Sequence, residues 1–171
     1  MSEYRVIMNR SGHETRVEVY YFPPIGEQGI TSYATVGLSC TPRSDGRLIG
    51  TEWVLALTPE LGGESVDRVF SYVCDLVAHH IAVSTDSEIP RVMEESALAP
   101  SGWTTRALLL DELRGESEAL EELRVGSETV QVLWAVPITA EEASLLLEEG
   151  LEAFDEYMDD SDEAIIDPRR S

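Results

Sequence analysis

Stretches in which apolar and polar residues alternate recur along the chain and predict β-strands. Residues 16–22 alternate in this way and stop at Pro23-Pro24, and residues 4–8 are expected to pair with them through a turn at Ser11-Gly12. The remaining predicted strands cover residues 31–39, 51–57, 106–112, 120–126 and 128–138. Turn-forming residues separate these stretches, so the pattern favours a sheet of short strands.

Two segments instead repeat their apolar residues every three or four positions, which predicts amphipathic helices. The first covers residues 65–81, with Ser65 as its N-cap and with His80 on the apolar face. The second covers residues 139–158 and begins with a capping box between Thr139 and Glu142. Its expected apolar face comprises Ala143, Leu147, Gly150, Leu151, Phe154 and Met158.

The order of these elements predicts an α+β fold, a mixed or mostly antiparallel β-sheet packed with two main helices. The 171 residues are enough for one domain with a sizeable core. We expect a single domain over residues 1–158, a long loop over residues 84–104, and an acidic, partly flexible C-terminal tail over residues 159–171. Ile165 and Ile166 are candidates for a short edge strand within that tail.

The charge is strongly negative and unevenly distributed. The formal net charge is −21, and residues 111–171 hold 19 of the 33 acidic residues and 4 of the 12 basic ones. Such a field repels nucleic acids and anionic membranes, and it favours a basic protein partner. The same acidity also serves simply to keep a small protein soluble.

Nothing in the sequence indicates a membrane or secreted protein. No apolar stretch is long enough to span a bilayer, and the N-terminal residues lack the basic-then-apolar order of a signal peptide. We therefore expect a cytoplasmic protein. Its two cysteines, Cys40 and Cys74, are then expected to be free thiols that act as small buried apolar residues.

The serine in Gly37-Leu38-Ser39-Cys40-Thr41 resembles a nucleophile elbow but lacks the second glycine that the strained turn requires. Polar turn residues follow it, where a hydrolase would have a helix. The histidines are no better placed, because adjacent His79 and His80 diverge on a helix and cannot both face one ion. We therefore expect no enzyme, while a pocket with perturbed acids near His13 or His80 would reopen that possibility.

Metal and cofactor sites are likewise not expected. The cysteines and histidines lack zinc-ligand spacing, and the acidic run at residues 159–163 lacks the glycine and the length of an EF-hand loop. No phosphate-binding or dinucleotide-binding fingerprint is present. The acidic run is expected to be a solvated helix end.

Two motifs, in this order, resemble the suppressor of fused (SUFU)-like domain family in its bacterial single-domain type. The first is Thr35-x-Gly37-Leu38-Ser39, after Tyr33 and before the strand that carries Glu52 and Trp53. The second is Trp134-x-x-Pro137-Ile138-Thr139-x-x-Glu142. The matched residues are expected to be structural: Tyr33, Thr35, Gly37, Leu38, Ser39, Glu52, Trp134, Pro137, Ile138 and Glu142.

The resemblance implies a non-enzymatic protein-binding domain without a cofactor. Many bacterial members look like immunity proteins of polymorphic toxin systems, so the implied partner is a cognate toxin. The negative charge of this chain favours a basic toxin, and nucleases are one class of basic toxin. The alternative is a regulatory or scaffold protein that holds a cellular partner such as a transcription factor. The stretch 40–50 carries partner contacts in the animal member but lacks its aromatic residue here, so partner identity does not carry over.

Partner contacts are expected on exposed charged residues of the turn at residues 41–50 and of the late helix. The candidates are Arg43, Asp45, Arg47, Glu148, Glu152 and Glu156. The sequence leaves the oligomeric state open.

Overall fold

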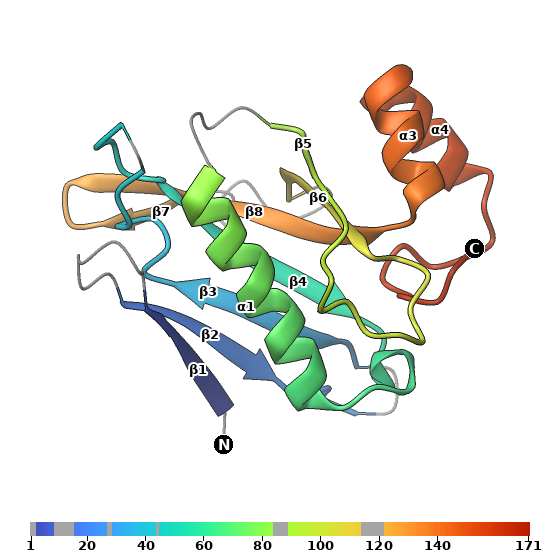
Figure 1. Ribbon diagram of the computed structural model, residues 1–171, viewed down its shortest axis with the longest axis horizontal. Helices are drawn as coiled ribbons and strands as arrows, with labels where there is room; N and C mark the ends of the chain where they lie inside the picture. The colour runs from blue at the N-terminus through green and yellow to red at the C-terminus, as the bar shows by residue number, and fades with distance from the viewer. Residues whose placement is uncertain (1–2, 9–15, 27–28, 44, 84–88, 114–121) are drawn as a thin grey trace.

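A computed structural model describes residues 3–8, 16–26, 29–43, 45–83, 89–113 and 122–171. Its described strands form one mixed sheet of eight strands (Figure 1). Seven of them follow the order β1-β2-β3-β4-β8-β6-β5, and β7 pairs separately with β8. The strands are β1 (Glu3–Met8), β2 (Arg16–Phe22), β3 (Thr31–Val36), β4 (Thr51–Leu57), β5 (Arg91–Met93), β6 (Ala107–Glu112), β7 (Glu122–Val125) and β8 (Glu128–Ile138).

Most neighbouring strands are antiparallel, and one pair joins distant parts of the chain in parallel. Strands β1 to β4 form an antiparallel meander, so the predicted pairing of residues 4–8 with 16–22 is confirmed. Strand β8 then lies parallel to β4, with Trp53 opposite Leu133, and antiparallel to β6 and β7. The α+β class and the mixed sheet are confirmed.

One face of the sheet is covered by helix α1 (Val66–Val83), as Figure 1 shows. Alternate residues of the strands point to this face because successive strand residues alternate between the two sides. Tyr33 of β3 and Phe70 of α1 meet there edge to face, with ring centroids 5.2 Å apart. His80 is buried in the same core against Trp53, which confirms the interpretation of both as core residues.

The opposite face of β6 and β8 packs against helices α3 (Ala140–Glu148) and α4 (Leu151–Asp159). Leu146 of α3 and Phe154 of α4 are buried there beside Leu109 and Val136 of the sheet. A short 3-10 helix, η1 (Leu61–Gly63), precedes α1. The two cores lie on the two sides of β6 and β8, so these strands contribute side chains to both of them.

The late helix differs from its prediction, because it is two helices and not one. Gly150 has φ +89° and lies between α3 and α4, and this left-handed conformation interrupts the helix. The expected apolar face therefore breaks: Phe154 is buried, but Leu147 is 74% exposed. Leu146 occupies the position facing the sheet instead.

Two smaller expectations also need correction. The expected loop over residues 84–104 contains the edge strand β5, and residues 84–88 of it lie outside the described residues. Cys40 is exposed, while Cys74 is half-buried against the α1 core, so the expectation of a buried thiol is wrong for Cys40.

Candidate functional site

The first motif folds into a loop whose backbone N–H groups bind the carboxylate of Glu52. Oε1 accepts from the N–H groups of Gly37 and Ser39 at 2.9 and 3.0 Å and from Ser39 Oγ at 2.8 Å. Oε2 accepts from Thr35 Oγ1 at 2.6 Å and from Leu38 N–H at 3.3 Å. Successive N–H groups that point at one anion form a nest, and an internal glutamate occupies it here.

Thr35 and Gly37 make this arrangement possible. Thr35 Oγ1 also accepts a hydrogen bond from Trp53 N–H at 2.8 Å, which ties the loop to β4. Gly37 has φ +91°, and a Cβ there would lie 2.5 Å from the carbonyl oxygen of Arg16. Ser39 is a structural donor to Glu52 in this geometry, and we assign it no catalytic role.

The turn at residues 41–50 is held against this loop by its own backbone. Ile49 N–H donates to Thr41 O at 2.9 Å, and Gly50 N–H donates to Ser39 O at 3.0 Å. Within the turn, Asp45 and Arg47 are exposed, and Asp45 Oδ1 accepts from Arg47 N–H at 2.9 Å.

The side chain of Arg43 forms a hydrogen bond within the turn. Its side chain is half-buried, and its Nη2 donates to Ile49 O at 3.0 Å. Of the three candidates in this turn, Asp45 and Arg47 are therefore the more accessible to a partner.

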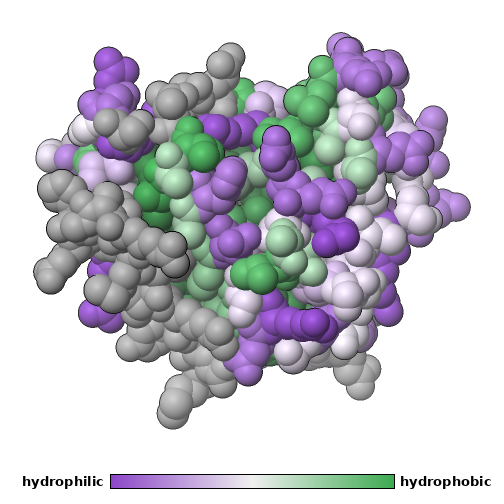
Figure 2. All heavy atoms as spheres, in the orientation of Figure 1, coloured by the Kyte–Doolittle hydropathy of each residue, from purple (hydrophilic) through white to green (hydrophobic). Residues whose placement is uncertain are grey.

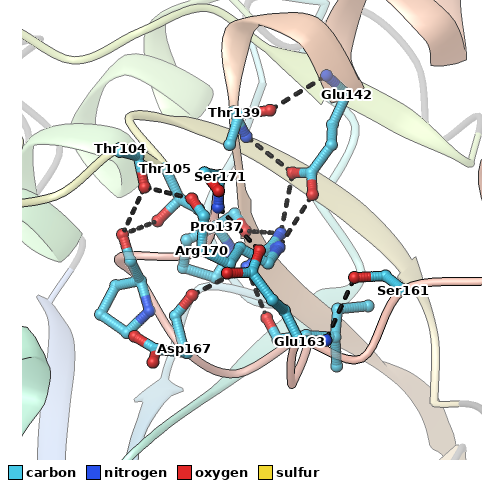
Figure 3. A network of polar contacts seen from close by, with 12 residues as sticks. Thr104, Thr105, Pro137, Thr139, Glu142, Ser161, Glu163, Asp167, Arg170 and Ser171 are labelled. Carbon is cyan, nitrogen blue, oxygen red and sulfur yellow. Dashed lines mark hydrogen bonds and ion pairs between the residues drawn. The ribbon is translucent and has the colours of Figure 1, made fainter. Parts of the chain in front are cut away.

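The second motif forms a buried ion pair with a residue of the expected tail (Figure 3). Glu142 completes the predicted capping box, because Thr139 N–H donates to its Oε2 at 2.7 Å and Thr139 Oγ1 accepts from Glu142 N–H at 3.1 Å. The same carboxylate binds Arg170 through Nε at 2.8 Å and Nη2 at 2.9 Å. Glu142 and Arg170 are each 3% exposed.

Arg170 was not singled out by sequence reasoning, because acidic residues dominate the segment in which it lies. A carboxylate on the sheet-facing side of a helix requires a partner, and that is the signal available in the sequence. It does not choose between the adjacent residues Arg169 and Arg170. The structure makes the choice, since Arg169 is exposed.

Acidic side chains gather around the outer surfaces of α3 and α4. Glu148, Glu152 and Glu156 are all exposed, and neither helix has a basic residue in its last turn. Figure 2 shows hydrophilic side chains around this corner of the molecule. The predicted candidates thus form two separate surfaces, because the turn at residues 41–50 lies toward the opposite end of β8 (Figure 1).

The described residues contain no group of three or more histidine, cysteine or acidic side chains that could hold a metal ion. His80 lies in the core, His79 is exposed, and His13 lies outside the described residues. None of the described helices combines the length and apolar character needed to cross a bilayer.

Comparison with known proteins identifies the same family at the level of the whole chain. The sequence model of the suppressor of fused protein (SUFU) family matches residues 13–171. No curated protein matches the chain.

Two solved structures share the fold at low sequence identity. A protein described as a SUFU homolog from Neisseria gonorrhoeae FA 1090 superposes with a TM-score of 0.70 at 15% identity, over 99% of this chain and 87% of the other. A structure of the Sufu–Fu complex superposes with a TM-score of 0.67 at 12% identity, over 100% of this chain and 83% of the other.

Proposed function

This chain belongs to the suppressor of fused family, and from that premise we propose that it is a non-enzymatic protein-binding domain. A solved relative of the same fold was captured in a Sufu–Fu complex, which supports a protein as the class of ligand. Through Glu52 and Glu142, the two motifs hold a loop and the start of α3 in place, which is a structural role. We propose no cofactor and no catalytic step.

The specific role that we propose is that of an immunity protein, which binds a cognate toxin of a polymorphic toxin system in the cytoplasm and neutralises it. The observation that carries this proposal is the net charge of −21 within this family. A strongly negative surface accelerates encounter with a basic protein and repels nucleic acid. A basic toxin domain, such as a nuclease, is the partner that this charge fits.

We propose the exposed carboxylates of Glu148, Glu152 and Glu156 as the main contact surface. They lie on adjacent helices and have no arginine partner among the described ion pairs. Asp45 and Arg47, together with the half-buried Arg43, form a second proposed contact at the other end of the sheet.

Co-expression with the product of an adjacent toxin gene tests the role directly. The chain should protect cells from that toxin and co-purify with it in a one-to-one complex. Absence of both protection and complex formation would overturn the immunity role. Recovery of a transcription factor or another cellular protein would favour the alternative regulatory role.

A titration of the purified toxin tests the surface. Replacing Glu148, Glu152 and Glu156 by glutamine should slow association several-fold at low salt, and the difference should shrink at high salt. The matched control replaces the exposed Glu60, Glu94 and Glu128, which removes the same charge from other places. Equal slowing in both variants would mean that net charge, and not this surface, directs binding.

A further inference from the structure

The guanidinium group of Arg170 uses all of its hydrogen-bonding capacity inside the protein (Figure 3). An arginine side chain has five N–H donors. Nε–H and one Nη2–H bind the two oxygens of Glu142 at 2.8 and 2.9 Å. The other Nη2–H donates to Pro137 O at 2.6 Å, and Nη1 donates to Ile165 O and Asp167 O at 2.7 and 3.2 Å.

The acceptors come from three separate parts of the fold. Pro137 is near the end of the central strand β8, Glu142 is in the first turn of α3, and Ile165 and Asp167 belong to the segment 161–171. A planar fork that meets a carboxylate through two bonds is a geometry that arginine provides and lysine does not. The contacts therefore recognise a guanidinium group specifically.

The segment 161–171 makes further bonds to the sheet side of the molecule. Thr58 N–H donates to Ile166 O at 3.1 Å, and the N–H groups of Thr104 and Thr105 donate to Pro168 O at 3.1 and 3.2 Å. Thr104 Oγ1 also donates to Arg170 O. These bonds involve Ile166, Pro168 and Arg170 itself, all within four residues of the guanidinium, so they form when the guanidinium is in place.

We propose that Glu142 and the carbonyl oxygens of Pro137, Ile165 and Asp167 form a guanidinium-binding pocket, and that Arg170 seated there latches the segment 161–171 onto the sheet and α3. The latch is a local device. When the arginine leaves, the segment opens while the sheet and α1 stay folded. The apolar core between the sheet and α1 contains no residue of that segment.

Chemical rescue tests the pocket. The variant R170A should melt on the order of 10 °C lower than the parent, because it leaves the buried carboxylate of Glu142 without its cation. Ethylguanidinium at millimolar concentration should restore part of that loss, while ethylammonium should restore less. The control R169A removes an exposed neighbouring arginine and should show neither the loss nor the rescue.

Amide hydrogen exchange tests the latch. In R170K, which keeps the charge but offers fewer donors, exchange at Thr58, Thr104 and Thr105 should accelerate at least tenfold. The amide of Gln131, which donates to Gly50 O at the other end of β8, is the internal control and should change little.

Either of two results would overturn the proposal. One is equal destabilisation of R170A and R169A, or rescue by both cations alike. The other is exchange at Thr58, Thr104 and Thr105 that changes no more than exchange at Gln131. If R170A does not fold alone, recovery of its folded state on refolding with ethylguanidinium, but not with ethylammonium, decides the question.

Discussion

At the scale of single residues, Glu52 and Glu142 have comparable structural roles. Glu52 binds a loop through backbone N–H groups, and Glu142 binds a helix terminus and an arginine. Hydrogen bonds to a charged group contribute more than neutral ones, about 1.5–3 kcal/mol each. The carboxylate of each residue thus joins segments that are distant in the sequence.

Gly37 is required by the close approach of two strands, and a pair of alanine variants tests this. Gly37 and Gly46 both have positive φ, but a Cβ at Gly46 would meet nothing within 4 Å. G46A should cost about 1 kcal/mol in unfolding free energy from the backbone alone. G37A should cost about 3 kcal/mol, because its Cβ also collides with Arg16 O. Equal losses in urea denaturation would contradict this explanation.

The buried phenol of Tyr72 should make the folded protein less stable at alkaline pH. Burial raises the pKa of its phenol well above the usual value, and nearby Glu95 adds to the rise while Arg106 opposes it. Above about pH 10 the unfolded chain loses the tyrosine proton while the folded chain keeps it, so the unfolded state is favoured as pH increases. This contribution to stability is therefore fully present below pH 10 and declines above it.

The measurement is the unfolding free energy in urea between about pH 8 and pH 11. The variant Y72F should show a shallower decline, because it has no proton to lose at that position. An unchanged slope in Y72F would show that other tyrosines account for the decline.

At the scale of elements, the division of the late helix decides which residues face the sheet. Gly150 separates α3 from α4, and Leu146 before the break and Phe154 after it both pack on β6 and β8. The periodicity of the whole segment 139–158 averages over the break, so it placed Leu147 on the buried face. A glycine after a run of periodic residues is itself a helix-end signal, and here it was the better guide.

Adjacent leucines test this correction. L146A should lower the unfolding free energy by about 2–4 kcal/mol, because Leu146 is 8% exposed and leaves a cavity. L147A should change it by less than about 0.5 kcal/mol, since Leu147 is 74% exposed. Urea denaturation measures both losses, and a larger loss in L147A than in L146A would show that Leu147, and not Leu146, packs against the sheet.

Most of the helices and strands could be predicted from the sequence, but the pairings between distant residues could not, and the reason is physical. Alternation predicted β2, β4 and β8, and the capping box predicted the start of α3, because these signals lie within a few neighbouring residues. The parallel pairing of Trp53 with Leu133 and the contact of Arg170 with Glu142 join residues far apart in the chain. Periodicity carries no information about such partners.

For the proposed contact residues, the sequence likewise predicts local properties but not their arrangement in space. The exposure of Asp45, Arg47, Glu148, Glu152 and Glu156 agrees with the expectation that charged turn and helix residues lie on the surface. Their separation into two surfaces depends on the direction of β8, which no local pattern gives.

At the scale of the whole molecule, the charge of −21 acts on the folded state itself. Like charges confined to one compact body repel each other, and salt weakens that repulsion over distances beyond about 8–10 Å. The buried pair of Glu142 and Arg170 is shielded from salt by the protein around it.

Moderate salt should therefore stabilise this protein. Raising NaCl from about 0.01 M to about 0.3 M should increase the melting temperature by several degrees, as measured by scanning calorimetry. The double variant E152Q/E156Q should start from a higher melting temperature and respond less. A melting temperature that falls with added salt would mean that attractive surface pairs outweigh the net repulsion.

The position of β8 between β4 and β6 has a consequence for how the protein emerges from the ribosome. The meander of β1 to β4 is complete once residue 57 has been made, but its inner edge stays open until residues 128–138 follow. During that interval β4 is paired with β3 on one side only, and its backbone groups on the side that later pairs with β8 have no partner strand. An unpaired edge of this kind invites association with other chains. Synthesis of β8 closes this edge and joins the two halves of the sheet in one step.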